Sequence, residues 1–283
     1  MSIKDITVVI TSFKSKDKIR NCLNSIDSEC KVINVENSND ENYKKKIESE
    51  FNNVTCILSG KNLGYAKANN IGIMNAKTKY VLILNPDTKL FPKTLEKFLD
   101  ASQRHPDFAI IAPSINLPET KNKILNSRPD SLQSVESVKG YAMFLNLSEF
   151  KEIGFFDENF FIYLEEIDLC KRLIKKGKKL YIDSKIQISH EGGESHDPSI
   201  NFEMELSRNW HWMWSKFYFQ KKYNGYFFSL INSLPKVAST IFKIMLYLFL
   251  FNKKKTLIYC HRLWGVTCAS IGQGSWYRPR IKS

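Results

Sequence analysis

The residue of this chain best placed to do chemistry is Asp87, the last residue of Asn85-Pro86-Asp87. The tripeptide directly follows the apolar run at residues 80–84, which is typical of a buried strand. In open α/β sheets, ligands bind at the carboxyl edge of the strands. A carboxylate there suggests a ligand for a hard divalent cation that faces a phosphorylated substrate. The same tripeptide also favours a plain turn, because Asn, Pro and Asp are all turn formers.

A second group of acids, Glu165, Glu166 and Asp168, opens a helical pattern. Acids in a first helical turn can simply complement the helix dipole, and Asp168 has Arg172 four residues on, as in an ordinary surface ion pair. Glu166 is less well explained in this way. The aromatic stretch at residues 155–163 precedes it and could desolvate a carboxyl group, which raises its pKa toward that of a useful base.

Two glycine-containing segments could contact a ligand. Asn62, Gly64 and Lys67 stand where a loop enters a helix, and free N–H groups with the positive end of the dipole favour a diphosphate there. Asn-x-Gly is also an ordinary turn and helix entry. Residues 190–195 hold paired glycines, so they form either a loop that closes over a bound ligand or a plain surface loop.

The elements that must position these residues alternate along the first part of the chain. Apolar runs predict strands, and apolar residues at helical spacing predict helices. Strands are expected at residues 6–10, 31–35, 54–58, 79–84 and 108–112, and helices at 19–26, 41–51, 64–76 and 92–104. This alternation predicts an α/β fold with a mostly parallel, doubly wound sheet.

The alternation loosens in the next part of the chain. Residues 113–136 are polar and proline-containing, so we expect loops or an edge hairpin over the sheet, as in many lids. A short apolar segment follows Gly140. A helix is expected at residues 164–174, and two short strands at residues 179–182 and 185–189.

The composition is that of a soluble globular protein. Of the 283 residues, 43% are hydrophobic and 25% charged, which allows a sizeable core in one or two domains. The six cysteines contain no Cys-x-x-Cys pair, so neither a disulfide framework nor a zinc site is indicated, and a reducing cytoplasm fits best. Asp5 and the short apolar run behind it read as a first strand, so we expect no secretory signal.

The positive charge is concentrated in the last part of the chain. The formal net charge is +13, and residues 201–283 hold thirteen Lys or Arg against Glu203 and Glu205 alone. Such a segment could bind nucleic acid, but it is rich in aromatic residues and has no recognisable nucleic-acid motif. We therefore expect no nucleic acid as a partner, and an anionic membrane surface instead.

Residues 226–251 are the most apolar stretch, but polar residues, two lysines and a proline interrupt them. A membrane-spanning helix needs about 20 mainly apolar residues. An amphipathic helix in the membrane interface is therefore expected, with Lys253, Lys254 and Lys255 on lipid headgroups. The alternative is a helix that packs on the catalytic domain or on a second subunit of a homodimer.

Five motifs together carry a resemblance to a known family. They are Glu36-Asn37-Ser38, the run from Asn62 to Asn70, Asn85-Pro86-Asp87, Gly140-Tyr141-Ala142-Met143 and the run from Leu164 to Leu173. In this order they resemble family 2 inverting glycosyltransferases, and look most like the bacterial rhamnosyltransferase branch. The resemblance spans residues 5–220. It implies a GT-A fold, Rossmann-like with a mostly parallel sheet flanked by helices, over residues 1–200, and a helical, basic C-terminal extension over residues 201–283.

The resemblance also implies a nucleotide-diphosphate-sugar donor and a divalent cation, Mg²⁺ or Mn²⁺. Asn85 stands where the family often has a first Asp, so the cation would rest on Asp87 and on His190, with His196 a weaker candidate. Glu36 would accept the imide N–H of a uracil or thymine base at a position where the family usually has Asp. The other residues expected to bind the nucleotide sugar are Thr11, Ser12, Asn37, Asn62, Gly64, Lys67, Asn70, Asn85 and Gly140.

Glu166 occupies the position of the family's catalytic base, with Glu165 and Asp168 as its neighbours. The expected reaction is a single displacement that moves L-rhamnose from dTDP-L-rhamnose to a hydroxyl of a lipid-linked or cell-surface polysaccharide. We expect it on the inner, cytoplasmic face of the cell membrane. A UDP-hexose or UDP-galactofuranose donor would use the same machinery. A nucleotide-binding scaffold without catalysis would also explain Asn85 and the Glu substitutions.

Overall fold

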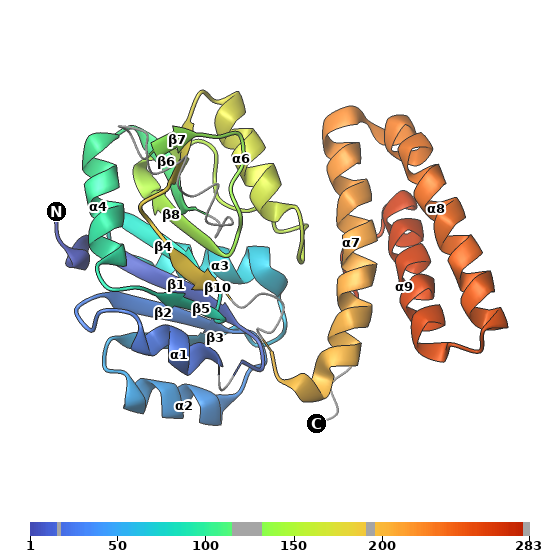
Figure 1. Ribbon diagram of the computed structural model, residues 1–283, viewed down its shortest axis with the longest axis horizontal. Coiled ribbons are helices and arrows are strands. Elements are labelled where there is room, and N and C mark those ends of the chain that lie inside the picture. Colours follow the sequence, from blue (N-terminus) through green and yellow to red (C-terminus); the bar gives the residue numbers. More distant parts are fainter. Residues whose placement is uncertain (16–17, 115–131, 191–195, 280–283) are drawn as a thin grey trace. The chain divides into compact units, whose positions relative to one another are not determined.

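The computed structural model describes residues 1–15, 18–114, 132–190 and 196–279 (Figure 1). Its strands are β1 (Ile6–Ser12), β2 (Lys31–Glu36), β3 (Val54–Leu58), β4 (Tyr80–Leu84), β5 (Thr88–Leu90), β6 (Phe108–Pro113), β7 (Leu132–Ser134), β8 (Ala142–Asn146), β9 (Lys179–Asp183) and β10 (Ile188–His190). Its α-helices are α1 (Lys18–Asn24), α2 (Glu41–Glu50), α3 (Gly64–Asn75), α4 (Thr94–Arg104), α6 (Glu165–Lys175), α7 (Asn201–Asn224), α8 (Tyr226–Phe249) and α9 (Lys253–Ser270). Short 3-10 helices are η1 (Ile3–Asp5), η2 (Leu147–Phe150) and η3 (Pro198–Ile200).

The chain forms two compact units. The first, called here the sheet unit, comprises residues 1–63, 67–156 and 166–197. The second, called here the helical unit, comprises residues 64–66, 157–165 and 198–283. Two short segments from the strand-rich part of the chain therefore belong to the helical unit, although the sequence patterns place them within residues 1–200.

The sheet unit is built on eight strands in the order β3-β2-β1-β4-β8-β6-β9-β7. The strands from β3 to β4 are parallel neighbours, and β8 runs antiparallel to both β4 and β6. The expected mostly parallel α/β sheet is therefore confirmed. The chain proceeds from β1 to β2 and β3 and then places β4 on the other side of β1. The carboxyl ends of β1 and β4 thus flank the point where the strand order reverses, which is where open sheets bind ligands.

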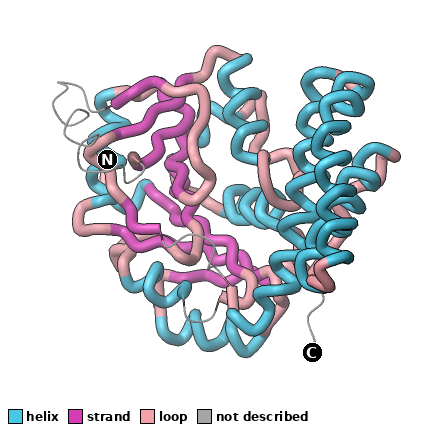
Figure 2. Tube along the Cα trace, turned by 45° about the vertical axis from the view of Figure 1, so that its right-hand side comes forward, coloured by secondary structure: helices cyan, strands magenta, loops and turns pink. Residues whose placement is uncertain are grey.

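Helices cover the two faces of this sheet (Figure 2). Alternate residues of β1 point to opposite faces, and Ile6, Val8 and Ile10 join one core cluster with the buried residues of α1, α2 and α4. Val9 points the other way, toward α3. A Cβ atom on Gly72 of α3 would come within 2.3 Å of the Val9 side chain, so a glycine is needed for this close approach. The resulting rigid core fixes the strand ends that carry Asp87 and its neighbours.

A separate two-stranded sheet pairs β5 with β10 antiparallel, in the register His190 opposite Thr88. The sequence patterns predict a strand ending at residue 189, and they miss β5. Three residues in a polar loop leave no periodicity to detect. This small pairing joins segments about a hundred residues apart in the chain and brings His190 beside the turn that holds Asp87.

Parts of the expected loops lie outside the described residues. Within residues 113–136, β7 forms the edge strand and pairs antiparallel with β9. Residues 115–131, and residues 191–195 of the glycine-containing loop, are among those not described. The expectations of a lid and of a closing loop therefore stay predictions.

The helical unit has its core between α7 and α9. Trp210, Trp214 and Phe217 of α7 pack with Val266 of α9 and with Tyr277 in one buried cluster. The resemblance implies a helical region over residues 201–283, and the helix expected at residues 226–251 corresponds to α8. The apolar residues of α9 follow no clear helical period. In the part of the chain that the structure describes, no helix is both long enough and apolar enough to cross a membrane.

One buried histidine makes the stability of the helical unit depend on pH. His211 is fully buried and donates from Nε2 to the Tyr277 carbonyl oxygen at 2.9 Å. Burial lowers the pKa of His211 from 6.5 to about 3. The unfolded chain therefore takes up a proton below pH 6.5 that the folded chain does not bind. The free energy of unfolding should fall as the pH drops from 6.5 toward 3, by up to about 1.4 kcal/mol per pH unit.

Tryptophan fluorescence can follow this transition, because all five tryptophans lie in the helical unit. We expect the thermal midpoint of wild type to fall more steeply below pH 6.5 than that of His211→Gln, which keeps an N–H donor for Tyr277 but does not titrate. Equal slopes for the two proteins would contradict this assignment.

Candidate active site

Asp87 sits in a β-turn that ends β4. The Thr88 N–H donates to the Asn85 carbonyl oxygen at 3.2 Å, so Asn85, Pro86, Asp87 and Thr88 form one turn with proline at its second position. The Asn85 N–H donates in turn to the Tyr141 carbonyl oxygen at 2.9 Å. The turn expected from the residue types is thus present, and it is anchored to the neighbouring segment so that the position of Asp87 is fixed.

The carboxylate of Asp87 is buried without a full set of hydrogen bonds. Its side chain is only 1% exposed, and its Oδ1 atom has no hydrogen-bond partner among the described residues. The imidazole of His190 lies close to it, with Nε2 3.5 Å from Oδ1. Leaving a buried carboxylate oxygen unsatisfied is costly. A cation between these two side chains would remove that cost.

His190 is held by its strand and by an aromatic ring. The pairing of β10 with β5 places it opposite Thr88, and its imidazole stacks on the Tyr141 ring with centroids 4.5 Å apart and planes 7° apart. Burial raises the pKa of Tyr141, so its hydroxyl stays neutral. Sequence reasoning gave Tyr141 no role of its own, although it stands inside the motif that begins at Gly140, which lies in the turn just ahead of it.

The two candidate ligands are not part of a larger protein-only metal site. Among the described residues, no three His, Cys, Asp or Glu side chains lie close enough together to hold a metal ion. His196, the weaker candidate, is buried in the sheet unit. Among the described residues, a cation at Asp87 and His190 would thus have two protein ligands.

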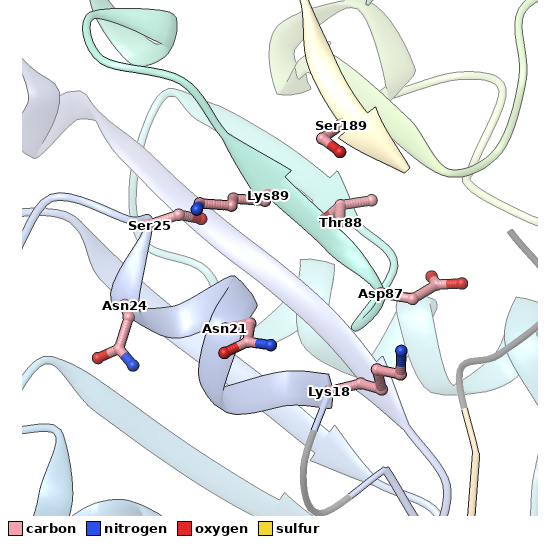
Figure 3. Close-up of a pocket in the computed structure, with 8 residues that line it drawn as sticks. All are labelled: Lys18, Asn21, Asn24, Ser25, Asp87, Thr88, Lys89 and Ser189. Atoms are coloured by element: carbon pink, nitrogen blue, oxygen red, sulfur yellow. The ribbon is translucent and has the colours of Figure 1, made fainter. Parts of the chain in front are cut away.

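A cavity of about 390 Å³ opens beside Asp87 (Figure 3). Lys18 extends toward Asp87 from the first turn of α1, and Lys89 lines the cavity from β5. Two lysines that line one cavity favour an anionic ligand there. Sequence reasoning missed both lysines. The signal for Lys18 was its place at the start of the first helix, directly beyond the carboxyl end of β1.

The ends of β1 and β2 lie at the same edge of the sheet. Their register sets Ser12 opposite Glu36, and the hydroxyl of Thr11 is buried without a hydrogen-bond partner among the described residues. The Glu36 carboxylate accepts hydrogen bonds from the N–H groups of Ser38, at 2.9 Å, and Asp40, at 3.1 Å. The structure thus gathers three of the predicted donor-binding residues at this edge and fixes the direction of Glu36.

Two predicted donor-binding asparagines hold backbone segments together. Asn70 donates to the Phe156 carbonyl oxygen at 2.9 Å and accepts from the Phe156 N–H at 3.0 Å. The Asn37 side chain accepts from the Leu63 N–H at 3.3 Å. These bonds give both asparagines a structural role in positioning loops, and a direct role toward a donor stays a prediction.

Gly64, at the start of α3, has a packing role that the sequence did not predict. Gly64 has φ of +83°, and a Cβ atom there would come within 2.4 Å of the Phe161 carbonyl oxygen. The Tyr65 N–H donates to that same oxygen at 2.7 Å. Close packing on Phe161 therefore requires the glycine, and one N–H group of the first turn is already used. Lys67 is exposed further along the helix, and Asn62 is half-buried in the loop before it.

The backbone is strained directly before the acidic helix. Tyr163 and Leu164 have φ of +75° and +70°, a conformation that side chains other than glycine rarely adopt. Each such residue costs about 1–2 kcal/mol. Strain of this kind collects at functional sites. This backbone conformation sets the direction in which α6 begins. Of the first residues of α6, Glu165 is buried and Glu166 is half-buried.

Asp168 has a structural partner. Arg172 donates from Nε to its carboxylate at 2.8 Å, and the Asp168 side chain is fully buried. The expected ion pair between these residues is therefore confirmed, but its acid is buried and not at the surface. Arg172 also donates to the carbonyl oxygens of Ile153 and Phe155. The Asp168–Arg172 pair therefore holds α6 against the loop that precedes it. Of Asp168 and Glu166, the more accessible acid is Glu166.

Comparison with known sequences gives consistent matches. The sequence model described as Glycosyl transferase family 2 matches residues 7–170. The low-salt glycan biosynthesis hexosyltransferase Agl10 of Haloferax volcanii is 26% identical over 192 residues, which cover 60% of this chain and 62% of the relative. The rhamnosyltransferase WbbL of Escherichia coli is 27% identical over 241 residues, covering 73% of this chain and 89% of the relative. An N-acetylglucosaminyl-diphospho-decaprenol L-rhamnosyltransferase of Mycobacterium tuberculosis is 24% identical, covering 59% of this chain and 69% of the relative.

Solved structures share the fold. The mannosyltransferase PcManGT of Pyrobaculum calidifontis, solved with GDP-Man and Mn²⁺, superimposes with a TM-score of 0.54 at 11% identity, over 95% of this chain and 87% of that one. Residues 1–349 of S. aureus TarS give a TM-score of 0.53 at 14% identity, over 96% of this chain and 93% of that one.

Proposed function

Since the chain belongs to glycosyltransferase family 2, whose sequence model spans residues 7–170, we propose that it is a metal-dependent inverting glycosyltransferase. Its donor is a nucleotide-diphosphate sugar, with dTDP-L-rhamnose the leading candidate. The observation that carries this proposal is the buried Asp87 carboxylate, with an unsatisfied Oδ1 and His190 Nε2 at 3.5 Å. This pair lies at the carboxyl end of β4, beside the reversal of strand order.

Asp87 and His190 would hold Mg²⁺ or Mn²⁺. A carboxylate oxygen suits both ions, and a neutral imidazole nitrogen is a common metal ligand in proteins. Two protein ligands leave room for oxygens of the donor diphosphate and for water, which Mg²⁺ in particular retains. When bound, the cation offsets the negative charge that grows on the departing nucleoside diphosphate.

The residues around the pair suit the rest of the donor. Lys18 and Lys89 line the adjoining cavity, where their charges would attract the diphosphate. Thr11, Ser12 and Glu36 lie at the neighbouring strand ends, where they would line the pocket for the base. The Glu36 carboxylate is already oriented by two backbone N–H groups, and its remaining lone pairs can accept the imide N–H of uracil or thymine.

Glu166 would act as the general base. It takes the proton from the acceptor hydroxyl while that oxygen attacks the anomeric carbon from the face opposite the diphosphate. The bond from that carbon to the diphosphate oxygen breaks, the nucleoside diphosphate leaves, and the anomeric configuration inverts. Asp168 forms an ion pair with Arg172, and this pair positions the helix that carries Glu166.

The relatives support the choice of substrates. Two of them are rhamnosyltransferases by name, and one acts on a decaprenol-linked sugar. We propose a lipid-linked or cell-surface polysaccharide as the acceptor. The chain spans only 62% of the length of Agl10, and UDP-hexose or UDP-galactofuranose is the alternative donor because the same machinery would bind it.

Donor turnover with purified full-length protein tests the proposal. dTDP-L-rhamnose, UDP-glucose and UDP-galactofuranose would each be incubated with Mn²⁺, with Mg²⁺ and with a chelator, and release of nucleoside diphosphate would be measured. We expect cation-dependent release that is fastest with dTDP-L-rhamnose. Binding of a donor without turnover, even when short glycan acceptors are added, would indicate the non-catalytic scaffold instead.

Tyr141 should act as a positioning residue for His190. Tyr141→Ala removes the stacked ring and should weaken Mn²⁺ affinity about 10- to 100-fold, as loss of an outer-shell partner usually does. Tyr141→Phe keeps the ring and should bind Mn²⁺ like wild type. Calorimetric titration of Mn²⁺ in the presence of dTDP measures both. Equal affinity of Tyr141→Ala and wild type would show that the stacking does not orient the ligand.

A further inference from the structure

Helix α8 presents its large apolar side chains to solvent. They recur at alternating spacings of four and three, with Ala238 completing the series, so they form one continuous stripe along the helix. The exposed residues of this stripe are Phe227, Ile231, Leu234, Ile241, Met245 and Leu248. Phe228, Phe242 and Phe249 lie beside it and are also exposed. We call these nine residues, with Ala238, the outer face of α8.

The residues of α8 that are buried are small and polar, although Val237 and Tyr247 also contact the other helices. Its two buried residues are Ser229 and Thr240, whose hydroxyls donate to backbone carbonyl oxygens four residues earlier, at 2.8 Å to Gly225 and 2.7 Å to Lys236. The core of the helical unit is supplied by α7 and α9. From α8, Val237 packs against this core, and the ring of Tyr226 meets the Phe217 ring edge-on. This is the reverse of an ordinary surface helix, which buries its apolar stripe. The outer face is therefore shaped for an apolar environment outside the described chain.

The turn from α8 to α9 continues this surface and adds positive charge. Phe249 is 80% exposed and Phe251 is 91% exposed, and residues 253–255 are three lysines in the first turn of α9. Positive charges at a helix N-terminus oppose the helix dipole, so the dipole does not account for lysines at this position. Only Lys254 among them forms a described ion pair, at 3.2 Å to Glu205.

We propose that the outer face of α8 and the 249–255 turn together dock on an anionic lipid bilayer. The apolar side chains would enter the boundary of the acyl region, and the lysines would lie among the headgroups. The positive charge around this surface favours an anionic bilayer over a second copy of the chain as its partner. Residues 206–283 contain thirteen Lys or Arg and no Asp or Glu, so a symmetric pairing of two outer faces would bring like charges together with no acid between them.

The proposed membrane docking is independent of the proposed reaction, because it is inferred from the helical unit alone. No described helix can span a bilayer, so α8 would lie in the plane of the interface. Anionic lipids are concentrated in the cytoplasmic leaflet of cell membranes. The docking surface therefore directs the protein to the cytoplasmic face of the membrane as a peripheral protein.

Co-sedimentation of the full-length protein with vesicles tests the proposal, with phosphatidylglycerol-phosphatidylcholine vesicles compared to pure phosphatidylcholine. The matched variants are Met245→Asp, on the outer face, and Met74→Asp, at the end of α3. The two methionines have nearly equal exposure, 58% and 60%, so the substitutions differ mainly in location. Met245→Asp should weaken partitioning into anionic vesicles about tenfold or more, whereas Met74→Asp should bind like wild type.

A second variant tests the charge. Replacing Lys253, Lys254 and Lys255 with Gln should weaken binding to anionic vesicles about a hundredfold and should remove most of its salt dependence. Circular dichroism checks that each variant is folded. Donor binding, measured in parallel without lipid, should be unchanged in Met245→Asp, so failure of docking is distinguishable from failure of the proposed reaction.

Three outcomes would overturn the proposal. Wild type could stay in solution with anionic vesicles at low salt. Met245→Asp and Met74→Asp could partition equally. Wild type could also be a dimer in the absence of lipid that Met245→Asp converts to a monomer, which would make the outer face an interface between two copies of the chain.

Discussion

Replacing Asp87 with Asn is expected to abolish cation-dependent donor turnover while leaving the fold at least as stable as wild type. The substitution removes a charge whose Oδ1 atom has no hydrogen-bond partner among the described residues, and relief of that burial favours the folded state. It also removes the carboxylate that would hold the cation. Loss of several kcal/mol of charge stabilisation corresponds to roughly 10³-fold in rate.

The matched control is Asp183→Asn, which also changes a buried acid at the end of a strand. Asp183 pairs with Arg104 at 2.9 Å and accepts a hydrogen bond from the Lys185 N–H. Its loss should lower the free energy of unfolding by about 1–3 kcal/mol and leave the response to Mn²⁺ unchanged. Thermal unfolding and turnover with titrated Mn²⁺ measure both effects. An Asp87→Asn protein that is destabilised yet keeps its cation dependence would assign Asp87 a purely structural role.

Glu166→Gln is expected to lower transfer by about 10²- to 10⁴-fold, the usual contribution of a general base. The amide keeps the size of the side chain but cannot accept the proton of the acceptor hydroxyl. Donor affinity should not change, because Glu166 contacts the acceptor and not the nucleotide in the proposed reaction. Calorimetry with the donor and initial rates with a glycan acceptor separate the two quantities.

The neighbouring acids provide the controls for this variant. Asp168→Asn should lose stability, because it leaves Arg172 without its buried partner. Glu165→Gln makes the same isosteric change one residue away and should transfer sugar at a rate near that of wild type. If Glu166→Gln transfers normally and Glu165→Gln does not, the base is Glu165.

Much of the fold could be predicted from local sequence patterns, because strands and helices each space their apolar residues with a characteristic period. The first four strands were predicted to within two residues, and the five ordered motifs predicted a family that the sequence comparison confirms. Asp87 was identified as a candidate ligand because it directly follows a buried strand. Each of these inferences needed only neighbouring residues.

The sequence by itself therefore determined the alternation of elements, the α/β class, the family and the positions of the key acids. The tertiary structure decided which residues meet them. His190 lies beside Asp87 because β10 pairs with the three-residue strand β5, and β5 is too short to leave a periodic signal in the sequence. Asp168 is buried with Arg172 because α6 packs inward, whereas the apolar stripe of α8 points outward. A helical period shows that a face is apolar, but contacts between distant segments decide what that face touches.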